Sequence, residues 1–435
     1  MATRIRREWD RLRLSLLVRN ASWMCVGQGL SVVCQGVYFI LLARLLGVLE
    51  YGIYVGAMAM VMVVAQYCAL GSHSVFLRYV SFDPGCYAKY WGNVLLTTLS
   101  VASFCTLLVI WLGPAMAHGD SRTLFAWVAV ANCLCAQLTA AAGRVFQTFE
   151  RMRITAFLNL LTNLARTVLA ASMLGWLHRA TSVQWALGAM LISAAAAAAA
   201  VAMVAWEYGK PEFSVRLAGE RAGEGFVFAL SYSTTGISND IDKAMLGHYG
   251  MNVANGIYTL AYRVVDVCTM PLASIQAAAF PRFFQKGIAG VNSTAEYAIR
   301  IAKRTAPLAL VSSVVMIIAA PIIPHVVGQS FSGSVEALRW LALLPLFRSL
   351  HMSAGDALSG AGHQKTRLTT QTVVAIFNFA TNLYVIPHYG WHGAAWSSLA
   401  TDGLLAILNW TVLLAVRDHA RKANPREWPR APLTE

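Results

Sequence analysis

Long apolar runs separated by short polar segments dominate the pattern of residues along the chain. An α-helix needs roughly 20 mostly apolar residues to cross the hydrocarbon core of a bilayer. Runs of that length predict spans at 20–46, 52–77, 90–113, 123–148, 154–177, 183–206, 225–248, 253–280, 299–321, 335–360, 367–387 and 392–416. The pattern therefore predicts an all-α integral membrane protein with about twelve transmembrane helices and no separate soluble domain.

The composition agrees with this prediction and also indicates which kind of partner the protein has. Of the 435 residues, 57% are hydrophobic and 12% are charged, whereas soluble domains carry about twice that charged fraction. The formal net charge is +14, but the basic residues lie between apolar runs and not on one soluble face. We therefore expect membrane lipid, and no nucleic acid, as a partner.

The basic residues also predict the orientation of the chain. Twenty-five of the 34 Lys and Arg residues lie in one alternate set of connecting segments, and two lie in the other set. Because cytoplasmic loops are enriched in Lys and Arg, both termini are expected in the cytoplasm with an even number of spans. The predicted parts are a basic N-terminus (1–19), a six-helix bundle (20–206), a cytoplasmic linker (207–224), a second six-helix bundle (225–416) and a basic cytoplasmic tail (417–435).

Two short patterns occur twice, each time six spans apart. Leu46-Gly47 with Gly52-Ile53-Tyr54 returns as Leu246-Gly247 with Gly256-Ile257-Tyr258, and Asn159-Leu160-Leu161-Thr162-Asn163 returns as Asn378-Phe379-Ala380-Thr381-Asn382. An even displacement keeps the membrane orientation. The halves are therefore expected to be parallel repeats related by an axis along the membrane normal, with a cavity between them.

Charged residues interrupt the seventh and eighth predicted spans, where charge is costly. They are Asp240, Asp242, Lys243, Arg263 and Asp266. Asp240 and Arg263 each lie about ten residues from the turn between the spans, so both lie ~15 Å deep at the rise of an α-helix. Either the cluster contacts a polar substrate or a coupling proton, or Asp240 or Asp242 pairs with Arg263 and fixes the hairpin. Three carboxylates face two basic groups, so one carboxylate is available to carry a proton.

Arginines also lie deep in the fifth and tenth spans. Arg166 shares one helical face with Asn159, Thr162 and Asn163, and Arg348 has Asp356 and Asp402 as candidate partners. A mid-membrane arginine must face water, an anion or a carboxylate. Its planar guanidinium suits bidentate recognition of phosphate.

Motifs of soluble catalysis and of cofactor binding are missing from the sequence. There is no Walker loop, no dinucleotide fingerprint after a strand and no HExxH pattern. Seven of the eight cysteines lie within apolar runs, and no His/Cys cluster accompanies them. We therefore expect no enzyme, no cofactor and no metal site.

Four groups of short motifs are spread over nearly the whole chain. They are Ala43-Arg44-Leu45-Leu46-Gly47 with Tyr51-Gly52-Ile53-Tyr54, Ile241-Asp242-Lys243 with Leu246-Gly247, Gly256-Ile257-Tyr258-Thr259-Leu260-Ala261-Tyr262-Arg263, and Ile386-Pro387-His388-Tyr389-Gly390 followed by Gly393-Ala394-Ala395. In these motifs the chain resembles the polysaccharide transporters of the multidrug/oligosaccharidyl-lipid/polysaccharide exporter (MOP) superfamily, which include the O-antigen and exopolysaccharide flippases. The resemblance implies two six-helix bundles that form a V around a cationic cavity. Such a protein moves polyprenyl-diphosphate-linked oligosaccharide across the bacterial cytoplasmic (inner) membrane by alternating access, with polysaccharide polymerase and assembly proteins as candidate partners.

The resemblance implies roles for the polar residues within the predicted spans. The expected substrate-binding residues are Arg166, Arg348, Arg263, Lys243, Asn159, Asn163, Asn378 and Asn382, and the expected coupling or ion-pair residues are Asp240, Asp242, Asp266 and Asp402. The family often has a basic residue before Ile-Asp, where this chain has Asp240. The hairpin is therefore less positive than the resemblance implies.

Three other functions deserve comparison. A multidrug antiporter of the same superfamily would need mostly carboxylates for cations, whereas the mid-membrane arginines favour an anion. A peptidoglycan lipid-precursor flippase of the sister branch is a further alternative. A membrane-embedded polymerase or glycosyltransferase would carry a sizeable outer loop or cytosolic domain, and neither is predicted.

Overall fold

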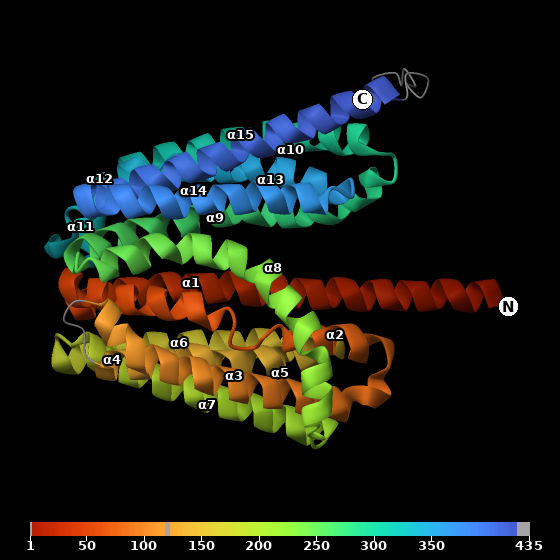
Figure 1. The fold of residues 1–435 in the computed structure, drawn as a ribbon, viewed down its shortest axis with the longest axis horizontal. Helices are drawn as coiled ribbons and strands as arrows, with labels where there is room; N and C mark the ends of the chain where they lie inside the picture. The colour runs from red at the N-terminus through yellow and green to blue at the C-terminus, as the bar shows by residue number, and fades with distance from the viewer. Residues whose placement is uncertain (1, 118–121, 424–435) are drawn as a thin grey trace. The chain divides into compact units, whose positions relative to one another are not determined.

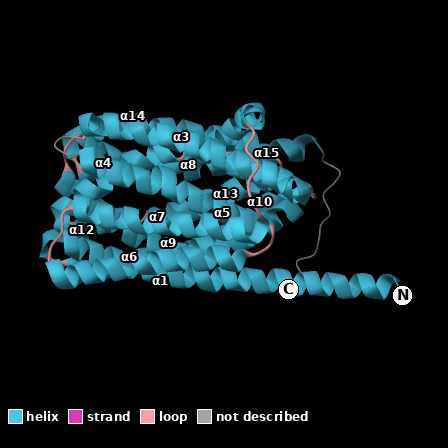
Figure 2. Cartoon of the chain, turned by 90° about the horizontal axis from the view of Figure 1, so that it is seen from below, coloured by secondary structure: helices cyan, strands magenta, loops and turns pink. Residues whose placement is uncertain are grey.

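The computed structural model describes residues 2–117 and 122–423, and all of their side chains except those of residues 2–29, 31, 32, 152, 231–235, 237, 238, 422 and 423. Helices make up nearly all of this described part, and no strand occurs in it (Figure 2). The predicted all-α class is confirmed. The basic side chains of the predicted N-terminal segment 1–19, and residues Arg426 and Arg430 of the predicted tail, lie outside the described residues.

Eight helices of the described part are long and apolar enough to cross a membrane. They are Val33–Ala65, Pro84–Met116, Arg122–Thr148, Arg153–Leu177, Ser182–Tyr208, Asn252–Gly287, Val291–Val327 and Trp391–Arg421. These spans confirm a multi-pass membrane protein, while the count of twelve stays a prediction. Two of the remaining predicted spans have a visible reason to differ: 335–360 is divided between two shorter helices, and 225–248 carries three charges near its end.

A single non-helical residue separates the first two predicted spans. Both belong largely to α1 (Ala2–Ala65), in which Gly47 has φ 70° and ψ 173° and is not helical. A positive φ is readily adopted by glycine and disfavoured for residues with a Cβ. The chain therefore passes from the first predicted span to the second through a kink at Gly47.

The chain divides into two compact units, each described here by itself. Unit 1 comprises Met1–Gly256 with Val326–Phe331, and unit 2 comprises Ile257–His325 with Ser332–Glu435. Besides α1, unit 1 contains α2 (Ser72–Phe82), η1 (Pro84–Cys86), α3 (Tyr87–Met116), α4 (Arg122–Ala129), a π-helical turn η2 (Val130–Cys135), α5 (Ala136–Thr148), α6 (Met152–Leu177), α7 (Ser182–Tyr208), α8 (Val215–His248), η4 (Gln329–Phe331) and the first residues of α9 (Asn252–Gly287).

Within unit 1, α1 packs against α6 and α8, and α3, α4, α5 and α7 pack among themselves (Figure 1). A core of buried side chains, among them Phe76, Trp91, Phe146 and Val204, joins α2, α3, α5 and α7. Aromatic rings contribute much of this core, since each buries a large apolar area.

The repeated glycine pattern of the sequence packs against itself in unit 1. A Cβ on Gly52 would lie 1.7 Å from the backbone oxygen of Asn252, and a Cβ on Gly256 would lie 2.3 Å from the backbone oxygen of Val48. The two contacts are reciprocal, because Val48 and Gly52 correspond to Asn252 and Gly256 at one constant displacement along the chain. Only glycine allows the backbones of the two copies to approach this closely.

Unit 2 contains the rest of α9, then α10 (Val291–Ala319), η3 (Ala320–Ile322), most of α11 (Ile323–Val327), α12 (Ser334–Leu341), α13 (Leu344–Gly360), α14 (Gln364–Tyr389) and α15 (Trp391–Ala423). In this unit α13 packs against α10 and α15, and α14 packs along α15 (Figure 1). Its buried core includes Phe283, Ala295, Leu358 and Leu413, from α9, α10, α13 and α15.

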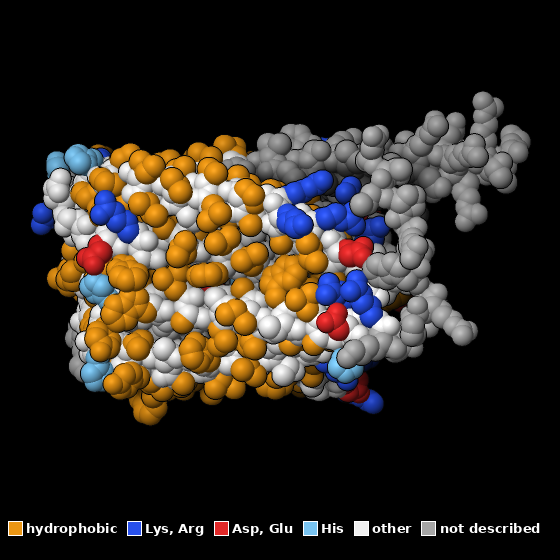
Figure 3. All heavy atoms as spheres, turned by 90° about the horizontal axis from the view of Figure 1, so that it is seen from above, with side chains coloured by type: hydrophobic (Ala, Val, Ile, Leu, Met, Phe, Trp, Pro, Cys, Tyr) orange, Lys and Arg blue, Asp and Glu red, His pale blue; other side chains and the backbone are white. Residues whose placement is uncertain are grey.

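The surface agrees with a bilayer environment. Figure 3 shows a broad field of hydrophobic side chains on one face, with Lys and Arg gathered mostly beyond one edge of it. On α10 the same change occurs along one helix: Arg300, Lys303 and Arg304 are exposed near its start, and Val311 and Ile318 are exposed further on. Lipid tails accept the apolar part, and the basic part suits the membrane–water interface.

Candidate functional site

Arg348 on α13 is the centre of a polar network in unit 2. Its Nη1 donates to Asp266 Oδ1 at 3.0 Å, its Nε donates to Asp402 Oδ2 at 3.2 Å, and its Nη2 contacts the hydroxyl of Tyr262. The guanidinium carbon also lies 5.1 Å from the centre of the Tyr262 ring. The side chain is 16% exposed. A guanidinium has five N–H donors, and the described residues engage three of them.

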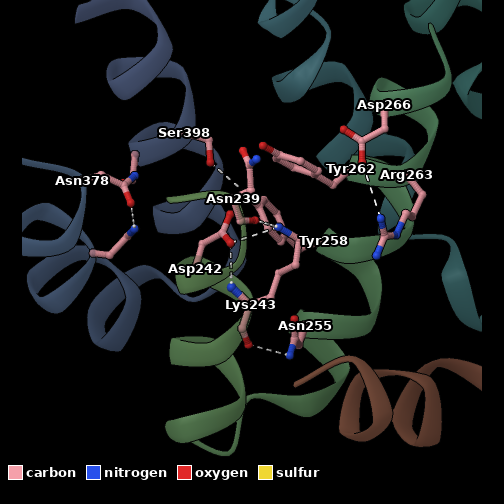
Figure 4. Close-up of polar contacts among 12 residues, drawn as sticks. Asn239, Asp242, Lys243, Asn255, Tyr258, Tyr262, Arg263, Asp266, Asn378 and Ser398 are labelled. Carbon is pink, nitrogen blue, oxygen red and sulfur yellow. Dashed lines mark hydrogen bonds and ion pairs between the residues drawn. The ribbon is translucent and has the colours of Figure 1, made fainter. Parts of the chain in front are cut away.

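The network extends by one residue at each end. Arg263 Nη1 lies 3.7 Å from Asp266 Oδ2 (Figure 4), and His351 Nε2 lies 3.9 Å from Asp402 Oδ1. Basic and acidic side chains therefore alternate in the order Arg263, Asp266, Arg348, Asp402 and His351, which we call the Arg348 network. Such pairing is required, because an isolated charge this far from water would be strongly destabilising.

Neighbouring hydrogen bonds fix the rotation of α13. Ser349 Oγ donates to Thr305 Oγ1 on α10 at 2.6 Å, and Gln276 Nε2 on α9 donates to Ser353 Oγ at 2.6 Å. All four of these residues are buried. They hold α13 so that Arg348 lies next to the carboxylates of α9 and α15.

The sequence predicted only some of the residues that contact Arg348. Of its two candidate carboxylates, Asp402 pairs with it, whereas Asp356 pairs with Arg367 at 3.0 Å. Tyr262 and His351 were not predicted from the sequence as members of this network. Helical spacing contained a signal for both, since Tyr262 lies one turn before Asp266 and His351 lies one turn after Arg348.

Asn378 and Asn382 are buried on α14 and face polar groups of unit 2. Asn378 Nδ2 donates to Thr401 Oγ1 at 2.8 Å and to Ser397 Oγ at 3.2 Å, and Asn382 Nδ2 donates to Asn378 Oδ1 at 3.2 Å. These bonds tie α14 to α15. Their role in binding a substrate stays a prediction.

Arg166 on α6 has a different environment in unit 1. Its Nη2 donates to Ser193 Oγ on α7 at 2.8 Å. Its Nε is buried and has no hydrogen-bond partner among the described residues. Asn159 is exposed and Asn163 is half-buried on the same helix. A buried donor without a partner costs about 1–3 kcal/mol. Arg166 Nε is therefore suited to donate a hydrogen bond to an additional acceptor group.

Asp242 and Lys243 form a buried pair on α8. Lys243 Nζ lies 3.1 Å from Asp242 Oδ1, and the two side chains are 5% and 4% exposed. Lys243 Nζ also contacts the backbone oxygen of Asn239, and the backbone oxygen of Lys243 accepts from Asn255 Nδ2 at 3.0 Å (Figure 4). Asp240 is half-buried. The predicted pairing of Asp240 or Asp242 with Arg263 joins residues of different units and stays a prediction.

Metal binding finds no support in the described residues, where no group of three or more His, Cys, Asp or Glu side chains is placed to hold an ion. The two deep arginines have different environments, each within its own unit. Arg348 is balanced by carboxylates, and Arg166 is bound through a hydroxyl.

Comparison with known proteins identifies the family of the chain. A family model described as "Polysaccharide biosynthesis protein" matches residues 17–286. No curated protein matches the chain.

Solved structures of related fold cover almost the whole chain. An inward-facing multidrug resistance MATE family transporter of the MOP superfamily is 16% identical, with 92% of this chain and 96% of that chain covered and a TM-score of 0.70. The lipid II flippase MurJ, in an inward closed conformation, is 12% identical over 94% and 93%, with a TM-score of 0.75. A MOP superfamily transporter from Pyrococcus furiosus, described as having a binding pocket of reverse polarity, is 14% identical over 95% and 96%, with a TM-score of 0.63. At these identities the likeness establishes the fold.

Proposed function

The chain belongs to the family of polysaccharide biosynthesis proteins, and from this membership we propose that it is a flippase for lipid-linked oligosaccharide. The substrate is a polyprenyl-diphosphate-linked oligosaccharide, an O-antigen or exopolysaccharide repeat unit. The protein moves it by alternating access across the bacterial cytoplasmic membrane, with both termini in the cytoplasm. It acts as a transporter and not as an enzyme, and polysaccharide polymerase and assembly proteins are its candidate partners.

The environment of Arg166 carries this proposal. The residue lies within an apolar helix, contacts a hydroxyl through Nη2 and leaves a buried Nε without a hydrogen-bond partner in the described part of the chain. A diphosphate oxygen would satisfy that donor and neutralise the charge with a charge-assisted hydrogen bond. Asn159 and Asn163 on the same helix are the candidates for contacts with the sugar.

Unit 2 supplies a second set of basic groups. Arg263 and Arg348 are balanced by Asp266 and Asp402 in the Arg348 network. A diphosphate that approaches must use the remaining donors of Arg348 or displace one carboxylate. Lys243, Asn378 and Asn382 complete the proposed substrate-binding residues, and Asp240, Asp242, Asp266 and Asp402 are the proposed coupling or ion-pair residues.

The alternative of a multidrug cation antiporter receives less support from the same geometry. A cationic drug needs carboxylates that are available to it. In the described residues Asp242 pairs with Lys243, Asp356 with Arg367, and Asp402 with Arg348. These three carboxylates are therefore already matched by basic side chains of the protein.

The experiment that tests the proposal replaces Arg166 in a strain that lacks the chromosomal gene. Arg166→Ala and Arg166→Gln should reduce surface polysaccharide at least tenfold at equal protein level, because one charge-assisted contact contributes about 1.5–3 kcal/mol and 1.4 kcal/mol is a factor of ten. Arg166→Lys should retain part of the export. Arg216→Ala is the matched control, since Arg216 is 89% exposed and pairs with Glu220 on the surface.

Lipid-linked oligosaccharide should accumulate in the strains with low export. Normal export by Arg166→Ala would refute the proposed contact. Rescue of a strain that lacks its peptidoglycan-precursor flippase, or export of cationic dyes without any effect on polysaccharide, would assign the chain to one of the alternatives.

A further inference from the structure

We propose that His351 is a proton-binding site, and that its protonation loosens the contact between Asp402 and Arg348, so that a proton and an anionic diphosphate bind together. The inference rests on the proposed function and concerns the regulation of the Arg348 network.

The geometry places Asp402 between two basic groups. Its Oδ2 accepts from Arg348 Nε at 3.2 Å, and its Oδ1 lies 3.9 Å from His351 Nε2. The latter distance is too long for a hydrogen bond of a neutral imidazole. It is short enough for attraction between an imidazolium and a carboxylate. The His351 and Asp402 side chains are each 19% exposed, so water screens this attraction only partly.

The net charge of the network depends on the protonation of His351. With a neutral imidazole, Arg263 and Arg348 balance Asp266 and Asp402. Protonation of His351 leaves one excess positive charge in an apolar surrounding, which is costly without a counter-ion. It also provides Asp402 with a second basic partner, so that Asp402 can release Arg348 Nε. An anion with two or more oxygens, such as a diphosphate, would then neutralise the excess positive charge and accept a hydrogen bond from Arg348 Nε.

Charged groups of three helices face His351. Arg348 lies on the same helix, Arg367 interacts from α14 and Asp402 from α15. Arg367 is itself paired with Asp356 at 3.0 Å and donates to Ser359 Oγ at 2.8 Å. Its charge is therefore matched locally, and Asp402 is the group that responds to the proton.

The packing of His351 allows a clean test of the ring. The backbone of this residue also contacts α15, because its oxygen accepts from Asn409 Nδ2 at 3.2 Å. His351→Gln keeps this bond and a polar side chain of similar reach while removing the imidazole that can take up a proton. By thermodynamic reciprocity, a proton that favours anion binding must also be taken up when the anion binds.

The experiment measures binding to the purified full-length protein by calorimetry. The probe is farnesyl-diphospho-N-acetylglucosamine, whose diphosphate is a diester of constant charge between about pH 6 and about pH 8, where histidine titrates. Binding to the wild type should be at least about fivefold tighter at the lower pH, with up to one proton taken up. His351→Gln should lose both the pH dependence and the proton uptake. His388→Gln, which alters an exposed histidine on α14, should retain both.

Asp402→Asn provides an independent variant. It removes the carboxylate through which the proton acts, so binding should lose its pH dependence while Arg348 remains. Equal pH profiles for the wild type and His351→Gln, with binding intact, would overturn the inference and leave the proposed function standing. No binding to the wild type at either pH would overturn both.

Discussion

The reciprocal glycine contact of unit 1 allows a quantitative prediction. Replacing Gly52 by Ala places a Cβ 1.7 Å from the backbone oxygen of Asn252, and replacing Gly256 by Ala places one 2.3 Å from that of Val48. Contacts below 3.0 Å are essentially not seen for real Cβ atoms, so the backbones must move apart. Overpacking of this kind costs about 1–3 kcal/mol, and we expect each variant to lose about that much stability.

The double variant tests the reciprocity itself. One separation of the two backbones makes room for both methyl groups, so the cost of Gly52→Ala with Gly256→Ala should be smaller than the sum of the single costs by about 0.5–3 kcal/mol, as for residues in contact. The assay is unfolding of the detergent-solubilised protein by titration with a denaturing detergent. Gly36→Ala is the control, because no atom lies within 4 Å of its added Cβ, and it should be neutral or stabilising. Additive costs, or single variants as stable as this control, would refute the reasoning.

Three further predictions concern the ion pairs and the topology. Lys243→Met leaves Asp242 buried without its cation and should cost about 3–5 kcal/mol, whereas the addition of Asp242→Asn should recover most of that loss in the same unfolding assay. Arg78→Gln removes a surface pair with Glu224 in which the Arg78 side chain is 58% exposed, while Glu224 keeps its contact with Arg221; it should change stability by about 1 kcal/mol at most. Reporter fusions should place Lys210 in the cytoplasm and Gly328 outside it; an external report at Lys210 would contradict the predicted topology.

Hydropathy was sufficient to predict where this chain is helical, but it did not predict every point at which a helix begins or ends. Each of the twelve apolar runs coincides with a helix or a pair of helices, because in lipid the backbone must satisfy its own hydrogen bonds. The run 335–360 shows the limit. It is divided between α12 and α13 at residues 342–343, where no glycine marks the break and Pro345 follows within the next turn.

The candidate site was predictable as a set of residue types and not as a set of partners. A deep arginine needs a counter-charge or water, which identified Arg166 and Arg348 from the sequence. Which carboxylate pairs with Arg348 depends on the rotation of α13 against α9 and α15. That rotation is fixed by contacts such as Gln276 with Ser353 between residues far apart in sequence. For this reason the sequence left Asp356 and Asp402 as equal candidates.

Transport of a lipid-linked oligosaccharide by the purified protein is the most direct test of the proposed function. The protein is reconstituted into liposomes that contain a fluorescent polyprenyl-diphosphate-linked oligosaccharide, and an added glycosidase reports which leaflet the sugar occupies. Wild-type protein should expose the inner-leaflet pool to the enzyme, and Arg166→Ala should slow this exposure at least tenfold, while Arg216→Ala should not. Liposomes in which the wild type moves no more substrate than protein-free liposomes, at any pH gradient or membrane potential, would contradict the account.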